Sequence, residues 1–126
     1  MADVIEPTEV ELKILKVLWD QPAATARAIH NAVHAGEAKN YSTTVKMLSV
    51  MLDKGLVRRD DSLRPQTFTA AVTRKRAQKN LLAQLVQKAF DGSAMSLVMQ
   101  ALSTGKPSPA DLQEIRELIQ QLEDKQ

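Results

Sequence analysis

The sequence contains no cysteine, four glycines and four aromatic residues. The missing cysteines exclude a disulfide framework, a thiolate zinc site and a cysteine nucleophile. The glycines never approach the spacing of a phosphate-binding loop or a dinucleotide fingerprint, and four aromatic side chains are too few for a base-stacking surface. No apolar run reaches transmembrane length, and the N-terminus is acidic, unlike a secretory signal. We therefore expect a small, cytoplasmic, mostly helical protein that needs no cofactor.

Charge is distributed unevenly along the 126 residues. The net charge is +2, but residues 1–79 contain 13 basic and 9 acidic residues, whereas residues 80–126 contain 4 and 6. At about 150 residues per domain, this length suits one domain, or one small domain with an appendage. The asymmetry predicts a basic working half and a neutral or acidic scaffold half, with a chance distribution of surface charge as the alternative.

Two helical patterns begin the chain. Thr8 and Glu11 have the spacing of a capping box, and apolar residues then recur at helical spacing as far as Asp20. Thr25 is the expected N-cap of a second helix, which we expect to end near Gly36.

A third helix and a hairpin are predicted next. The helix should run from residue 42 to residue 54, with Gly55 as a left-handed C-cap. The side chains expected to face inward are Val45, Leu48, Met51 and Leu52. Residues 56–59 and 67–72 are compatible with two short strands joined by a polar loop. Three helices followed by a basic two-stranded hairpin make up a winged helix-turn-helix, which we assign to residues 1–72.

The pattern of the second half, residues 73–126, predicts a separate helical region. A helix capped by Thr73 should end at Phe90, a short apolar segment covers residues 94–102, a loop covers 103–107, and Ser108 caps the last helix. The fold class is therefore mainly α with a small β-hairpin: a winged-helix domain followed by a helical dimerisation region.

Several segments resemble the penicillinase-repressor family of bacterial winged-helix repressors. They are TEVELKILKVLW (8–19), YSTTVKML (41–48), DKGLVRR (53–59), AFDGS (89–93) and SPADLQEIREL (108–118). The resemblance implies a dimeric repressor of two-fold operator DNA, with N-terminal domains that contact DNA and C-terminal helices that hold the dimer.

The resemblance also implies a possible switch. In family members that sense β-lactams, a membrane-bound sensor metallopeptidase triggers cleavage of the repressor in its dimerisation region. Gln100 and Ala101 stand here at the position of the family's Asn-Phe cleavage bond, and the C-terminal cysteine motif of the copper-sensing branch is absent. The implied partners are double-stranded operator DNA, a second copy of the chain and such a peptidase, without insertion of this chain into a membrane.

We predict that the start of the third helix enters the major groove, where threonine and lysine can contact base edges or phosphates. Comparison with the family pattern leaves Thr43 and Thr44 as alternative outward residues. Arginines beside the hairpin suit backbone or minor-groove contacts, and the cluster Arg74, Lys75, Arg76 and Lys79 suits phosphate. The predicted DNA-contacting residues are Tyr41, Ser42, Thr43, Thr44, Lys46, Met47, Arg58, Arg59 and Arg64. Solvated surface is the alternative for each group.

Metal and catalytic roles are not expected. His30 and His34 have the spacing of a helical metal pair, but Asn31 stands where a zinc-peptidase motif requires Glu. Asp53 and the loop pair at 60–61 do not form a converging pair of acids, so we expect no enzyme activity.

The apolar stripes of the second half exceed what three helices can bury against one another, which predicts pairing with a second copy. Packing within the monomer is the alternative. The predicted dimerisation residues are Leu81, Leu82, Leu85, Phe90, Leu97, Val98, Leu102, Leu112, Ile115, Leu118, Ile119 and Leu122. Two other functions stay open: a winged-helix protein–protein interaction module without sequence-specific DNA binding, and a regulator with an effector pocket between its domains.

Overall fold

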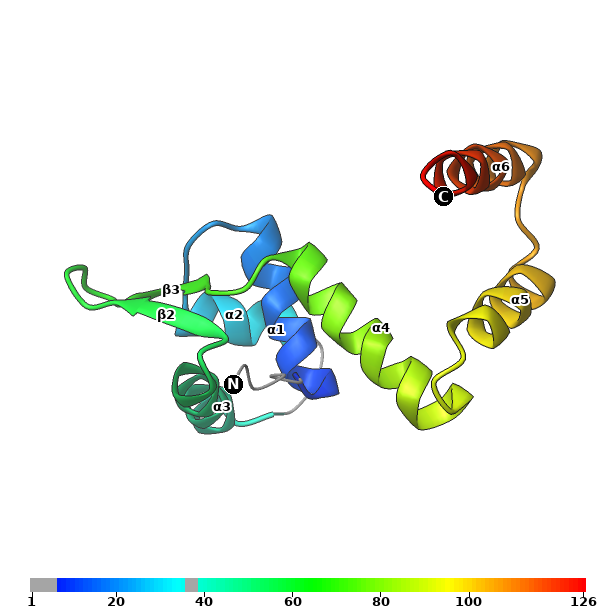
Figure 1. Ribbon diagram of the computed structural model, residues 1–126. Helices are drawn as coiled ribbons and strands as arrows, with labels where there is room; N and C mark the ends of the chain where they lie inside the picture. The colour runs from blue at the N-terminus through cyan, green and yellow to red at the C-terminus, as the bar shows by residue number, and fades with distance from the viewer. Residues whose placement is uncertain (1–6, 36–38) are drawn as a thin grey trace. The chain divides into compact units, whose positions relative to one another are not determined.

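The computed structural model describes residues 7–35 and 39–126 (Figure 1). Its elements, in chain order, are α1 (Glu9–Asp20), β1 (Ala24–Thr25), α2 (Ala26–Val33), α3 (Tyr41–Lys54), β2 (Val57–Asp60), β3 (Thr67–Ala70), α4 (Arg74–Phe90), α5 (Ala94–Gly105) and α6 (Pro109–Asp124). The mainly helical fold with a small hairpin is confirmed. The chain divides into two compact units, residues 1–83 and 84–126, with the division inside α4.

The core of the first unit lies between α1, α2, α3 and the sheet. Its buried apolar residues are Ile14, Leu15, Leu18, Ala24, Ile29, Leu48, Met51, Leu56, Val57 and Phe68. The capping box is present: the Thr8 hydroxyl accepts from the Glu11 amide, and the Glu11 carboxylate accepts from the Thr8 amide. Gly55 adopts a left-handed conformation at φ 78° and ends α3 as expected. Gly36, the expected end of the second helix, lies outside the described residues.

The sheet has three strands in the order β1-β3-β2, all antiparallel. The sequence predicted only β2 and β3, because β1 is two residues long and carries no alternating pattern of its own. Ala24 and Thr25 pair with Phe68 and Thr67, which ties the turn before α2 to the hairpin. The hairpin of β2 and β3 extends beyond the helices of this unit as a wing (Figure 1).

The start of α4 is fixed to the first unit. The Thr73 hydroxyl accepts from the Arg76 amide, as expected for a cap, and Ala77 is buried. The Trp19 indole donates a hydrogen bond of 2.9 Å to the backbone oxygen of Val72, immediately before the helix.

The second unit contains the end of α4 together with α5 and α6. Ser93 caps α5, and Ser108 forms a capping box with Asp111 at the start of α6. The helix α5 continues through Gly105, so the loop predicted from residue 103 begins only at Lys106, which is left-handed at φ 49°. Hydroxyl groups of Ser103 and Thr104 donate to carbonyls four residues earlier, so both polar side chains are satisfied within the helix. Both α5 and α6 are described completely, and neither has a buried residue.

Within the described ranges, no helix combines the length and the apolar character that crossing a bilayer requires.

Candidate nucleic-acid interface

The helix α3 presents one fully open stripe between two grooves of the first unit. The groove toward the wing is lined by Tyr41, Val45 and Ser49, and the groove toward α1 is lined by Thr43 and Met47. The exposed residues of α3 that line neither groove repeat at helical spacing: Ser42, Lys46, Val50 and Asp53. We define these four as the outer stripe of α3. Lys46 is its only cation.

The two adjacent threonines differ in their placement. Thr44 is 1% exposed and lies in the core side of α3, whereas Thr43 is exposed. Thr44 was a candidate DNA contact, but its side chain is buried and its hydroxyl oxygen contacts His30 Nδ1. Val45, which we expected to face inward, is 44% exposed, so that expectation was wrong. The register differs because Thr44, not Val45, takes the inward position four residues before Leu48.

A chain of ring and hydroxyl contacts joins α2 to the start of α3. The His30 Nδ1 atom lies 2.7 Å from the Thr44 hydroxyl oxygen, which satisfies the buried threonine. The edge of the Tyr41 ring meets His30 in a T-shaped contact, with centroids 5.7 Å apart. Arg27 covers the Tyr41 ring at 3.8 Å. Tyr41, a predicted DNA contact, is therefore half-buried among side chains of α2.

The wing presents exposed arginines near acidic residues. Arg58 lies exposed on β2, next to Arg59, whose Nε atom pairs with Asp61 at 2.6 Å. Arg64 donates to the backbone oxygen of Asp61.

The Asp60 carboxylate closes the same turn. Hydrogen bonds from the Ser62 hydroxyl and amide lower the pKa of Asp60. The Asp60 carboxylate therefore stays charged at neutral pH and holds the backbone of the turn at Ser62. Among the arginines predicted to contact DNA, Arg59 and Arg64 both contact Asp61.

In the basic cluster at the start of α4, one residue already forms an ion pair. Arg74 pairs with Asp20 at 3.1 Å and lies over the Trp19 ring, with 5.4 Å from its guanidinium to the ring centroid. It therefore holds α4 to α1. Lys75, Arg76 and Lys79 are exposed.

One ion pair of the first unit escaped sequence reasoning. Glu11 is 1% exposed, and its carboxylate accepts from Lys54 Nζ at 2.9 and 3.0 Å. Burial acts to raise the pKa of Glu11, but hydrogen bonds from the Thr8 amide and the Lys54 ammonium outweigh it and lower the pKa. Nothing local marks this contact, because the two residues lie 43 positions apart. Arg27 was also missed, since a lone arginine on a helix carries no signal of its own.

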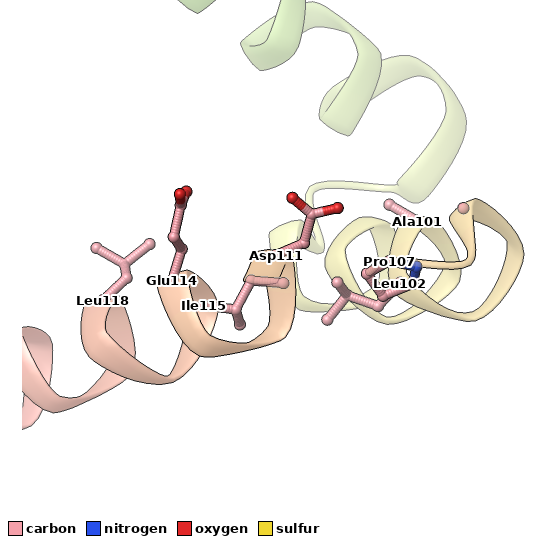
Figure 2. Close-up of a pocket in the computed structure, with 8 residues that line it drawn as sticks. Ala101, Leu102, Pro107, Asp111, Glu114, Ile115 and Leu118 are labelled. Atoms are coloured by element: carbon pink, nitrogen blue, oxygen red, sulfur yellow. The ribbon is translucent and has the colours of Figure 1, made fainter. Parts of the chain in front are cut away.

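The residues predicted to form a dimer interface remain at least partly accessible. Leu82, Leu85, Val98, Leu112, Leu118, Ile119 and Leu122 are exposed, and Leu81, Phe90, Leu97, Leu102 and Ile115 are half-buried. Ala101, Leu102, Ile115 and Leu118 line one open groove of the second unit, together with the acidic side chains of Asp111 and Glu114 (Figure 2).

The two histidines contact each other, with ring centroids 5.3 Å apart. Over the described parts of the chain, no group of three or more His, Asp or Glu side chains has an arrangement that could hold a metal ion.

Comparison with known proteins identifies the family. The family model of the penicillinase repressor matches residues 7–121, and no curated protein matches the sequence. Among solved structures, the chain is similar to a MarR family transcriptional regulator from Silicibacter pomeroyi DSS, with 23% identity and a TM-score of 0.45. That match covers 90% of this chain and 66% of the length of the regulator. The family model matches nearly the whole chain, and the winged-helix fold described above agrees with it. The protein therefore belongs to the penicillinase repressor family of transcriptional repressors.

Proposed function

We propose that the chain is a homodimeric repressor that binds a two-fold symmetric operator through its winged helix-turn-helix. The observation that carries the proposal is the outer stripe of α3. It leaves Lys46 exposed at the second turn of a helix that belongs to a helix-turn-helix pair. In such domains the N-terminal part of the second helix contacts base edges in the major groove.

The chemistry of the interface suits DNA. Lys46 can bind the guanine edge or a phosphate, and Ser42 at the helix start can bind either. Thr43 borders the stripe on one side and is exposed. Arg58 on the wing supplies a cation that can contact the backbone. We therefore place DNA against the outer stripe and the wing.

Dimerisation is supported by the second unit. Eight of its large apolar side chains are at least 36% exposed: Leu85, Met95, Val98, Met99, Leu112, Leu118, Ile119 and Leu122. Exposed large apolar side chains in this number favour an interaction surface. A second copy would cover it and would hold two DNA-binding units at the spacing of two half-sites, about one helical turn or a multiple apart.

Release by a sensor peptidase is the proposed route of induction. Gln100 and Ala101 are both exposed and lie inside α5. A cut between them would separate α6 from the rest of the chain and remove much of the apolar surface available for pairing. Any signal that weakens pairing lowers operator affinity, because the two heads then bind independently.

The test is fluorescence anisotropy of the full chain with duplexes tiled across the region upstream of its own gene. We expect one duplex to bind with clear sequence preference and a strong salt dependence. Lys46→Ala should lower operator affinity about 10-fold, the lower part of the range for one base contact. Lys125→Ala, at the end of α6, is the matched control and should bind as the wild type does.

Two results would overturn the proposal. Binding without sequence preference would favour the protein–protein interaction module, and unchanged affinity of Lys46→Ala at moderate salt would remove α3 from the interface. Sedimentation tests the dimer separately: a stable monomer at micromolar concentration contradicts pairing through the second unit.

A further inference from the structure

Arg27 occupies a prepared position beside α3. It lies in the first turn of α2, and its guanidinium carbon is 3.8 Å from the centroid of the Tyr41 ring. Tyr41 is in turn held by the T-shaped contact with His30. The arginine side chain is exposed, and its guanidinium lies over the ring.

The surroundings of Arg27 are electropositive. Arg27, Tyr41 and Arg59 line the same groove between α3 and the wing, and the described residues of that lining include no acidic side chain. Arg59 already pairs with Asp61, whereas no carboxylate of the described residues pairs with Arg27. A guanidinium stacked by its face on an aromatic ring keeps its N–H edges available for an anion with two oxygens.

We propose that Arg27 binds a phosphate of the DNA backbone and that Tyr41 is the positioning residue that presents it. The inference rests on the proposed DNA-binding function and extends it to α2. In a helix-turn-helix, the first helix of the pair crosses the DNA backbone while the second lies in the groove, so a cation on α2 faces phosphates and not base edges. Stacking on Tyr41 restricts an otherwise flexible side chain before binding, which reduces the rotamer entropy lost in the complex.

The experiment is a salt titration of DNA binding by the full chain, on the preferred duplex and on an unrelated duplex. Removing one phosphate contact should reduce the slope of log affinity against log salt by about 1. Arg27→Ala should therefore lose about 3- to 4-fold less affinity than the wild type between about 50 and 200 mM salt. The loss of affinity at low salt should be equal for both duplexes. Arg27→Lys should retain the wild-type slope, and Lys125→Ala controls for the loss of one charge far along the chain.

Two variants of Tyr41 test the positioning role. Tyr41→Phe keeps the ring and should retain the salt slope of the wild type, whereas Tyr41→Leu should weaken binding to both duplexes and lower the slope. The double variant of Arg27→Ala with Tyr41→Leu should bind little worse than Arg27→Ala alone, because both changes remove the same contact. Thermal unfolding followed by Trp19 fluorescence shows whether each variant keeps its fold.

The outcomes separate the inference from the function beneath it. If the wild type binds DNA and Arg27→Ala has the same slope and affinity, the inference is wrong and the proposed function stands. A loss confined to the preferred duplex would contradict a phosphate contact, and strictly additive losses would contradict positioning by Tyr41. If the wild type binds neither duplex, the proposed function fails and the inference fails with it.

Discussion

The ion pair between Glu11 and Lys54 allows a sharp test of what holds the first unit together. It joins the start of α1 to the last turn of α3. The change Lys54→Met keeps most of the apolar stem of the side chain and removes its ammonium group. The Glu11 carboxylate, 1% exposed, would then lose its cationic partner and keep its contact with the Thr8 amide.

The expected cost follows from the burial of each partner. Removing one partner of a fully buried ion pair costs about 3–5 kcal/mol, whereas an exposed pair contributes about 0–1 kcal/mol. Here the Glu11 side chain is buried and the Lys54 side chain is 36% exposed, so water can reach one side of the pair. We therefore expect Lys54→Met to lower the free energy of unfolding by about 2 kcal/mol, between these limits.

Trp19 provides the assay. It is the single tryptophan of the chain, and its contact with Val72 places it in the first unit. With a urea dependence of about 1–3 kcal/mol per molar, the loss should move the unfolding midpoint by about 1 M. Lys46→Met, an exposed lysine of the same helix, is the control and should change the midpoint little. Equal midpoints for Lys54→Met and the wild type would refute the argument.

The remaining predictions concern pH, the fold and the dimer. Because the pKa of Glu11 is lowered in the folded state, the ion pair stabilises the fold at neutral pH. This stabilisation is lost as pH falls from about 4.3, the ordinary pKa of glutamate, through the lowered pKa of the folded state. Glu11→Gln should thus be less stable than the wild type at pH 7, and the difference in stability should disappear in urea titrations at acid pH. Thr44→Val should cost about 1 kcal/mol because it removes the partner of His30 Nδ1, whereas Thr43→Val at the surface should leave the melting temperature unchanged. Gly55→Ala forces an L side chain into φ 78° and should cost about 1 kcal/mol in the same urea assay. Leu118→Glu should shift sedimentation toward the monomer at micromolar concentration, and an unshifted dimer would remove this position from the interface.

Local signals accounted for the starts of α1, α2 and α6 and for the end of α3. The capping residues Thr8, Thr25 and Ser108 all accept the hydrogen bonds expected of N-caps, because a cap is satisfied within three residues of its own sequence. Gly55 ends α3 for an equally local reason. The end of α5 was missed, because its hydroxyl residues were interpreted as loop residues although they bond within the helix.

The candidate interface was only partly predictable. Lys46 and Thr43 are exposed as expected, while Thr44 is buried. A one-residue shift in helical phase rotates a side chain by about 100°, and the apolar pattern of α3 is too irregular to fix that phase. Tyr41 was identified as a surface contact, but its surroundings depend on Arg27 and His30 of another helix.

The sequence by itself determined the order of the helices and the hairpin, the caps, the change from helix to hairpin after Gly55 and the family, since each depends on neighbouring residues or on the order of short motifs. Only the tertiary structure decided which face of α3 is open, which arginines are already paired and which acid is buried. These depend on contacts between residues such as Glu11 and Lys54 that lie far apart in the chain. Such contacts leave no periodic trace in the sequence, because they form only when α1, α2 and α3 pack around a shared core.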